Sequence, residues 1–152
     1  MQSIGVSAEI TSLRYLLPSG DLLRTFKGDM SDGLTVLVVE DDLDIRELLR
    51  LTLEVAGYRV IEANNGLEGL DAADRYEPDA ILMDMSMPII DGCQVTRMIR
   101  QNPRLATVPI IACTAYNRWE WRGKSILAGC TDFLVKPVDS RKLLSMLSRY
   151  LG

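Results

Sequence analysis

Short apolar runs alternate with longer amphipathic segments from residue 34 to the end of the chain. Apolar runs of strand length predict five β-strands, at residues 34–39, 58–62, 79–83, 108–113 and 132–135. Runs such as LTVLVV and VPIIAC are apolar on both faces, as expected where helices cover both sides of a parallel sheet. The pattern therefore predicts an α/β fold built from repeated βα units.

The segments between these strands have helical periodicity. In the first, Ile45, Leu48, Leu49 and Val55 follow the spacing of one helix face, and Gly57 is the predicted stop. Asp42 and Asp44 precede this face and are predicted to cap the helix, and Asp91 with Gly92 predicts a turn and another helix start. Four further helices are predicted at about residues 66–76, 92–101, 118–128 and 139–150.

Residues 1–33 do not follow this alternation, so we predict an N-terminal extension of residues 1–33 and one domain of residues 34–152. Apolar residues of the extension are interrupted by Pro18, Ser19 and Gly20, which allows short helical pieces at most. A flexible extension is the leading interpretation. Two alternatives are that Met30 is the true start of the protein and that the extension is a docking arm.

Charge and composition exclude several classes of function. The chain has 17 Lys and Arg against 21 Asp and Glu and no basic tract, so we expect no direct nucleic-acid partner. No apolar run reaches the roughly 18 residues of a membrane span, and the first residues do not resemble a secretory leader. We therefore expect no membrane insertion and a cytoplasmic location. Three cysteines without metal-ligand spacing are predicted to be buried apolar residues.

Chemically distinctive residues stand at the downstream ends of four of the predicted strands. Glu40 and Asp41 follow the first, Asp84 the third, Thr114 the fourth and Lys136 the fifth. The crevice of an open α/β sheet lies outside the carboxyl ends of its strands, so these side chains are expected to converge. Three carboxylates about 4 Å apart repel by roughly 4 kcal/mol per pair at an effective dielectric near 20, so the cluster needs a cation.

Magnesium suits an all-oxygen cluster better than zinc or copper, because Mg²⁺ prefers hard carboxylate, carbonyl and water ligands. A metal that binds phosphoryl oxygens beside a carboxylate allows that carboxylate to act as a nucleophile, and Asp84 is the candidate. Lys136 would offset the charge of the incoming phosphoryl group, and the Thr114 hydroxyl could donate to one of its oxygens.

Four segments together carry a family resemblance. VVEDD at 38–42, DMSMPIIDG at 84–92, TA at 114–115 and FLVKP at 133–137 resemble, in order and spacing, the receiver domain of two-component response regulators. The resemblance spans about residues 34–152. It implies a flavodoxin-like sheet of five parallel strands in the order 2-1-3-4-5, with five helices.

The resemblance also implies roles for individual residues. Asp84 corresponds to the phosphorylated aspartate, Asp41 with Glu40 to the acidic pair that holds Mg²⁺, and the Ser86 backbone carbonyl to a further ligand. Thr114 and Phe133 correspond to the hydroxyl and aromatic positions of the family's conformational switch. Lys136 corresponds to the family lysine, and its bond to Pro137 is expected to be cis.

Two pairs of residues are candidates for tuning and for contacts. Ser86 and Tyr116 occupy positions that set the lifetime of the phosphoryl group in this family, and a bulky Tyr116 that obstructs water predicts a comparatively long-lived acyl phosphate. Trp119 and Trp121 cannot both face the core from one helix, so at least one is expected to be exposed. An interface with a partner or a second copy, as in a homodimer, is one interpretation, and packing on the sheet is the other.

We therefore expect a stand-alone receiver domain rather than an enzyme with turnover. It would accept a phosphoryl group from a histidine kinase or histidine phosphotransfer protein, lose it slowly by self-dephosphorylation, and signal to a downstream protein target, since no output domain follows Gly152. One alternative is a haloacid-dehalogenase-like phosphohydrolase, but that class has a second Asp where Ser86 stands. Another is a receiver-like interaction module that works without phosphate.

Overall fold

Five parallel strands form one sheet in the order β2-β1-β3-β4-β5. The structure is a computed structural model, and it describes residues 33–115 and 119–152. The strands are β1 (Thr35–Val39), β2 (Arg59–Ala63), β3 (Ala80–Asp84), β4 (Ile110–Thr114) and β5 (Asp132–Val135). The helices are α3 (Leu43–Val55), α4 (Gly66–Tyr76), α5 (Gly92–Arg100), α6 (Trp119–Ala128), α7 (Ser140–Leu151) and the short 3-10 helix η1 (Pro103–Leu105).

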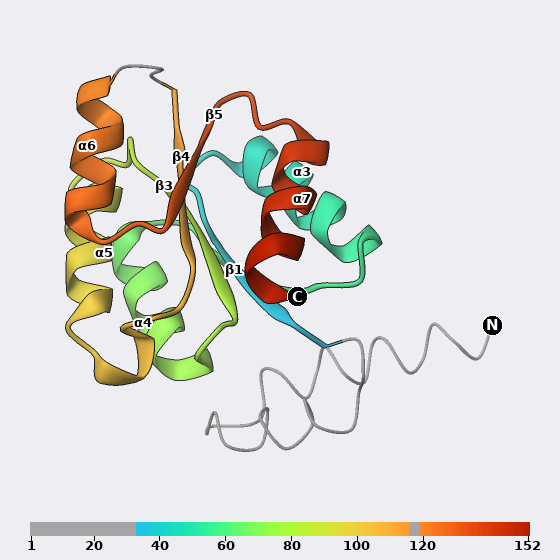
Figure 1. Ribbon diagram of the computed structural model, residues 1–152, viewed down its shortest axis with the longest axis horizontal. Helices are drawn as coiled ribbons and strands as arrows, with labels where there is room; N and C mark the ends of the chain where they lie inside the picture. Colours follow the sequence, from blue (N-terminus) through green and yellow to red (C-terminus); the bar gives the residue numbers. More distant parts are fainter. Residues whose placement is uncertain (1–32, 116–118) are drawn as a thin grey trace. The chain divides into compact units, whose positions relative to one another are not determined.

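Helices cover both faces of the sheet. Figure 1 shows α3 and α7 together on one side of the strands and α4, α5 and α6 on the other. Each layer has its own core, because alternate residues of the central strands point to opposite faces. The first core joins Val36 and Leu82 to residues of α3 and α7, and the second joins Leu37 and Ile81 to residues of α4, α5 and α6. The α/β fold and the strand order 2-1-3-4-5 are thereby confirmed.

Burial of the central strands follows from this double covering. Every residue of β1, β3 and β4 is buried, whereas β2 and β5 at the edges are only partly buried. In the sequence, the edge strand β2 (RVIEA) contains charged residues, and the edge strand β5 (DFLV) is a shorter apolar run. The near-continuous apolar runs therefore mark the centre of the sheet, as expected for parallel strands packed on both sides.

Element boundaries differ from the predicted ones by a few residues. Strand β4 begins at Ile110 rather than at residue 108, directly after Pro109, which has no amide hydrogen to donate. Strands β3 and β4 run on to include Asp84 and Thr114 as their last residues. The three-residue helix η1 was not predicted, because so short a turn has no hydrophobic period.

Helix caps stand at the predicted positions. The Asp42 side chain accepts a hydrogen bond from the Ile45 backbone at 3.0 Å, and Asp44 lies in the first turn of α3. Asp91 begins α5 with a reciprocal capping box. Gly57 follows the end of α3 with φ 96°, a left-handed conformation that glycine adopts without steric cost. The helix starts at Asp42 and Asp91 and the stop at Gly57 are confirmed, whereas Asp44 lies within the first turn of α3 and is not its cap.

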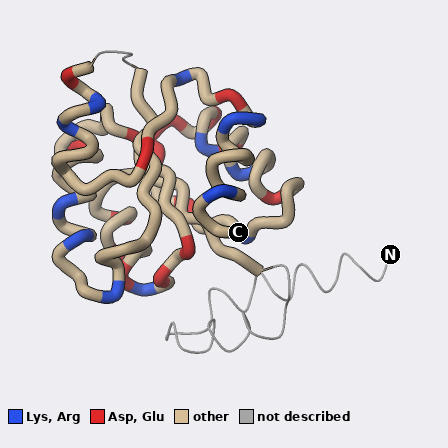
Figure 2. Tube along the Cα trace, in the orientation of Figure 1, with Lys and Arg blue, Asp and Glu red and all other residues tan. Residues whose placement is uncertain are grey.

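The predictions about the N-terminal extension, membrane insertion, charge and cysteines have different outcomes. Of the predicted extension at residues 1–33, only Gly33 lies within the described residues. Among the described residues, the structure has no helix with the length and hydropathy of a membrane span. Figure 2 shows Lys and Arg interspersed with Asp and Glu over the helices on both sides of the sheet. All three cysteines are buried, as predicted.

Candidate functional site

Three carboxylates meet at the carboxyl ends of two neighbouring strands. Strands β1 and β3 pair directly, with Val39 opposite Met83, so the residues that follow these positions lie side by side. One carboxylate oxygen each from Glu40, Asp41 and Asp84 lies within 4.8 Å of the others. Glu40 and Asp84 are each only 2% exposed, whereas Asp41 is exposed, so the cluster opens to solvent on the side of Asp41.

Lys136 supplies the positive charge of this cluster. Its Nζ atom lies 2.9 Å from Glu40 Oε2 and 3.0 Å from Asp84 Oδ1, so one ammonium bridges both buried carboxylates. The residue directly follows β5, and its backbone N–H donates to the Thr114 carbonyl at 2.7 Å. Lys136 therefore reaches the cluster from a strand that is not adjacent to β1 or β3, and its backbone is held by β4.

Backbone amides complete the hydrogen bonding of the two buried acids. The Ser86 N–H donates to Asp84 Oδ1 at 3.0 Å, and the Asp42 N–H donates to Glu40 Oε1 at 3.3 Å. Each buried carboxylate thus accepts from Lys136 and from one backbone amide. Charge-assisted hydrogen bonds of this kind offset the desolvation of a buried carboxylate.

The pKa values of the cluster reflect its crowding. Burial raises the pKa of Glu40, and the charge of Asp84 adds to this rise, while the hydrogen bond from Lys136 opposes it. Burial and then Asp84 raise the pKa of Asp41. Burial by itself lowers the pKa of Lys136, but its hydrogen bonds with Glu40 and Asp84 outweigh that effect, so its pKa lies above the usual value. The lysine is therefore cationic at neutral pH.

The donor set fits a hard divalent cation. Three carboxylates and one ammonium leave a formal charge of −2 when all are ionised, and no nitrogen or sulfur ligand is part of the cluster. Carboxylate oxygens with room for water are the ligands that Mg²⁺ prefers. The opening beside exposed Asp41 provides that room.

The remaining residues of the family resemblance surround this cluster. Thr114 ends β4 and is 2% exposed, and Asp84 pairs with the residue before it, Cys113. Ser86 is exposed two residues beyond Asp84. The Lys136–Pro137 peptide bond is cis. The structure therefore gathers the predicted acids, lysine and hydroxyl at one edge of the sheet.

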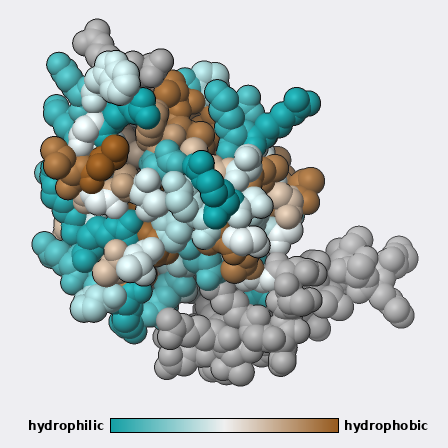
Figure 3. Space-filling model, viewed as in Figure 1, coloured by the Kyte–Doolittle hydropathy of each residue, from teal (hydrophilic) through white to brown (hydrophobic). Residues whose placement is uncertain are grey.

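Phe133 lies in β5, and the two tryptophans lie in the first turn of α6. Phe133 is half-buried on β5, and the Arg122 guanidinium lies 4.1 Å from the centre of its ring. Trp119 is 82% exposed and Trp121 half-buried, which confirms that at least one is exposed. Figure 3 shows apolar atoms at the surface over α6, where Ile126 and Leu127 are also exposed. Tyr116 lies outside the described residues, and an interface role for the tryptophans stays a prediction.

Two residues that shape the site were not predicted to do so. Gly92 at the start of α5 packs so closely that an added Cβ would lie 2.3 Å from the Asp84 carbonyl oxygen. Its sequence signal was an Asp-Gly pair, which indicates a turn but not a close approach. Arg46 on α3 donates from Nη1 to the Glu40 carbonyl at 2.8 Å. In the sequence it is one of several charged residues on a helix, with no local signal of this contact.

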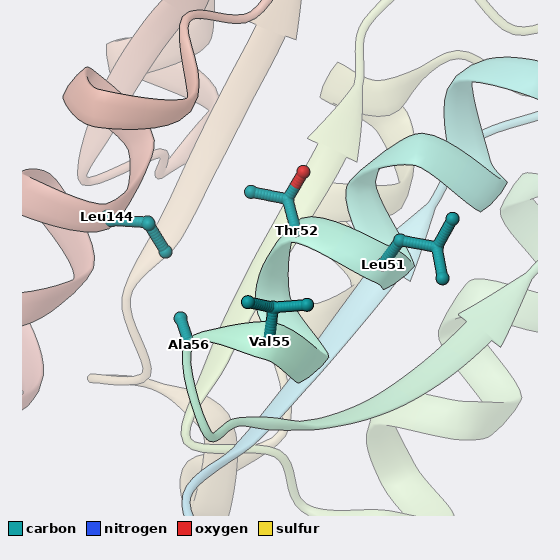
Figure 4. Close-up of a pocket in the computed structure, with 5 residues that line it drawn as sticks. All are labelled: Leu51, Thr52, Val55, Ala56 and Leu144. Atoms are coloured by element: carbon teal, nitrogen blue, oxygen red, sulfur yellow. The ribbon is translucent and has the colours of Figure 1, made fainter.

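A separate apolar groove lies away from the acidic cluster. It is lined by residues of α3 and α7, namely Leu51, Thr52, Val55, Ala56 and Leu144. Figure 4 shows Leu144 extending from α7 toward Ala56 at the end of α3. The acidic cluster stands at the opposite, N-terminal end of α3. The groove therefore has no part in the chemistry of the cluster.

Comparisons with known proteins agree on one family. The model of the response regulator receiver domain matches residues 36–148. The polar-differentiation response regulator DivK of Brucella anthropi is 34% identical over 118 residues, which cover 78% of this chain and 96% of DivK. The chemotaxis protein CheY4 of Vibrio cholerae superposes with a TM-score of 0.74 at 33% identity, covering 76% of this chain and 97% of that one.

A second similar structure contains a metal ion. It is the receiver domain of a sensor histidine kinase from Pseudomonas aeruginosa, with a magnesium ion coordinated in its active-site cleft. It has a TM-score of 0.74 and 37% identity, and the match covers 79% of this chain and 98% of that chain.

Proposed function

This chain belongs to the response regulator receiver domain family, and from that membership we propose that Asp84 is its phosphoacceptor. A receiver domain is a signalling domain rather than a classical enzyme. The observation that carries the assignment is the position of Asp84, which ends the central strand β3 and shares the Lys136 ammonium with Glu40. Glu40 contacts the same ammonium, so the choice of Asp84 over Glu40 as the phosphoacceptor rests on the family resemblance of segment 84–92.

Magnesium is the proposed cofactor. The carboxylates of Asp41, Glu40 and Asp84 would form the acidic site of the ion, and the Ser86 backbone carbonyl would be a further ligand. When bound, Mg²⁺ neutralises the acidic cluster and the oxygens of the incoming phosphoryl group. The composition of the cluster and its opening to solvent support this assignment.

The proposed reaction moves one phosphoryl group. A carboxylate oxygen of Asp84 attacks the phosphorus atom of a phosphohistidine, a P–O bond forms and the P–N bond breaks, and its electron pair returns to the imidazole. Lys136 lies 3.0 Å from Asp84 Oδ1, and its compact charge would stabilise the negative charge of the phosphoryl oxygens. Thr114, on the adjacent strand, would donate its hydroxyl to one of those oxygens.

The output is proposed to be a change of conformation. Movement of the Thr114 hydroxyl toward the phosphoryl group would free space for Phe133 to turn inward, which would remodel the surface of α6, β5 and α7. A shift from about 1:99 to 99:1 needs about 5.5 kcal/mol of preference for the active state. Several charge-assisted hydrogen bonds together with the ion can provide a preference of that size.

Partners follow from the family. Receiver domains interact with histidine kinases and with downstream targets, and we propose a histidine kinase or a histidine phosphotransfer protein as the donor here. A cytoplasmic location and a homodimer stay predictions. The phosphohydrolase and the phosphate-independent module are not favoured.

Intact mass spectrometry tests the assignment directly. The full chain is incubated with acetyl phosphate and Mg²⁺, and we expect one phosphoryl adduct that is absent from Asp84→Asn and from samples with excess EDTA. Asp91→Asn is the matched control, because this exposed aspartate caps α5 and lies outside the cluster. An adduct on Asp84→Asn would contradict the proposal, and continuous release of phosphate over many turnovers would favour the phosphohydrolase.

The lifetime of the adduct is a separate question. A long-lived acyl phosphate is the expectation from Tyr116 together with Ser86. Its decay is followed by mass after removal of acetyl phosphate, and Tyr116→Ala should shorten it. An unchanged decay rate would show that Tyr116 does not obstruct water.

A further inference from the structure

We infer that Arg46 is a positioning residue that holds the Glu40–Asp41 turn in the geometry that binds the cation. The inference rests on the proposed function, because it assumes that Mg²⁺ binds at this cluster. Arg46 does not belong to the cluster itself. It acts from α3, through the backbone of the turn rather than through a carboxylate.

Arg46 connects three points at the carboxyl ends of β1 and β2. Its Nη1 atom donates to the Glu40 carbonyl oxygen at 2.8 Å and to Asn64 Oδ1 at 3.2 Å. Its Nε atom lies 3.4 Å from Glu62 Oε1. The side chain is only 13% exposed, so the guanidinium is held between these partners rather than solvated. A rigid fork with several donors suits this bridging position.

The contact with the Glu40 carbonyl determines where Asp41 points. The carbonyl of Glu40 and the amide nitrogen of Asp41 belong to one planar peptide group, so a hydrogen bond to that oxygen orients the whole plane. The Glu40 N–H is held from the other side by the Ala63 carbonyl at 3.1 Å. Asp41 itself is exposed, so its position in the cluster depends on the backbone that carries it.

Positioning and charge predict opposite effects when Arg46 is removed. As a positive charge near a cation site, Arg46 repels Mg²⁺, and its loss would tighten binding. As the group that holds the turn, it keeps Asp41 beside Asp84, and its loss would weaken binding. Groups that orient metal ligands from outside typically change metal affinity by about 10-fold to 100-fold when removed. The sign of the change therefore separates the two roles.

The experiment compares Mg²⁺ affinities by NMR titration of the full chain with MgCl₂. Arg46→Met keeps the apolar stem and removes the donors, and we expect its dissociation constant to rise about tenfold. Arg50→Met is the matched control, since Arg50 lies one turn along the same helix and also pairs with Glu62, at 3.7 Å. We expect the Mg²⁺ affinity of Arg50→Met to stay within about twofold of the wild-type affinity, because Arg50 contacts Glu47, Glu54 and Glu62 and not the Glu40–Asp41 turn.

A second readout needs no metal. Loss of the hydrogen bond at the Glu40 carbonyl should shift the ¹⁵N resonance of the Asp41 amide in metal-free protein, and Arg50→Met should leave it in place. Arg46→Lys keeps the charge but cannot bridge all three partners, so it should also weaken Mg²⁺ binding. Urea unfolding in EDTA tests whether the variants are folded. If Arg46→Met does not fold, the Mg²⁺ affinity of Arg46→Lys tests the positioning role instead.

Each outcome has one meaning. Mg²⁺ binding by Arg46→Met or Arg46→Lys that equals or exceeds wild-type binding would overturn the positioning role and leave the proposed function intact. A wild type that binds no Mg²⁺ would instead overturn the metal site of the proposed function, and this inference with it. Weaker binding by both Arg46 variants, with a shifted Asp41 amide and normal Arg50→Met, supports it.

Discussion

Replacement of Lys136 by methionine should destabilise the metal-free protein by about 3 kcal/mol at pH 7. Methionine keeps most of the side-chain volume and removes the ammonium. Glu40 and Asp84, each 2% exposed, would then face one another without a cation. The expected loss is therefore that of a broken buried ion pair rather than that of a cavity.

The magnitude follows from the two contacts of Lys136. At 2.9 Å and 3.0 Å, with an effective dielectric near 20, each contact contributes roughly 5 to 6 kcal/mol of Coulomb attraction before desolvation is subtracted. Removal of one partner from a buried pair typically costs about 3 to 5 kcal/mol. The Lys136 side chain is 18% exposed, so we take the lower end of that range.

The loss should depend on pH and on Mg²⁺. The pKa of Glu40 is already raised by burial, and it rises further without Lys136, whose hydrogen bond lowers it. A carboxyl group whose folded pKa is raised contributes stability that is present below its unfolded pKa of 4.5 and lost as pH rises. Destabilisation by Lys136→Met should therefore shrink as pH falls from 7 to about 4. Mg²⁺ should stabilise the variant more than the wild type, because it replaces the missing charge.

Urea unfolding, followed by tryptophan fluorescence at both pH values with EDTA or Mg²⁺, measures these differences. Lys142→Met is the control, because Lys142 is exposed on α7, and it should change the free energy of unfolding by less than about 0.5 kcal/mol. A Lys136→Met loss that is equally large at pH 4 and pH 7, or no larger than that of Lys142→Met, would refute the electrostatic reasoning.

Three further predictions concern backbone and burial. Gly92→Ala should lower the free energy of unfolding, measured with urea, by at least about 2 kcal/mol, because its Cβ would lie 2.3 Å from the Asp84 carbonyl oxygen. Gly123→Ala in α6, where an added Cβ has nothing within 4 Å, should raise it by up to about 1 kcal/mol. Equal effects of the two substitutions would contradict this reasoning. Ile89→Gly should raise the free energy of unfolding by about 1 kcal/mol, because Ile89 is fully exposed and its φ of 70° is strained for a branched side chain. A lower free energy of unfolding would show that the backbone at residue 89 is not strained. Burial raises the pKa of Cys113 from 9.0 to about 12, so the stability from its neutral thiol is complete below pH 9 and lost as pH rises toward 12. Between pH 8 and 10, the free energy of unfolding measured with urea should fall by about 1.4 kcal/mol more in the wild type than in Cys113→Ala. If the two proteins lose the same free energy over this range, the raised pKa of Cys113 is contradicted.

Local patterns were sufficient for the order and type of the elements. The apolar runs located all five strands within two residues, and Asp42 and Asp91 located two helix starts, since caps and periodicity depend on neighbours in the chain. The rule that ligands gather at the carboxyl ends of parallel strands placed the acids and the lysine at one edge. The strand order 2-1-3-4-5 came from the family resemblance, because periodicity does not say which strands pair.

Contacts between distant residues were decided only by the tertiary structure. Lys136 and Glu40 are 96 positions apart, and no local pattern states that one ammonium bridges two buried carboxylates at about 3 Å. Trp119 is exposed and Trp121 is half-buried, because the rotation of α6 about its axis on the sheet sets which of its side chains face solvent. Arg46 and Gly92 look ordinary in sequence, and they matter because long-range strand pairing and helix packing bring the backbone of the acidic cluster against them. The sequence by itself determined which groups reach the site, and the packing of helices on the sheet decided their distances, their burial and the residues that hold them.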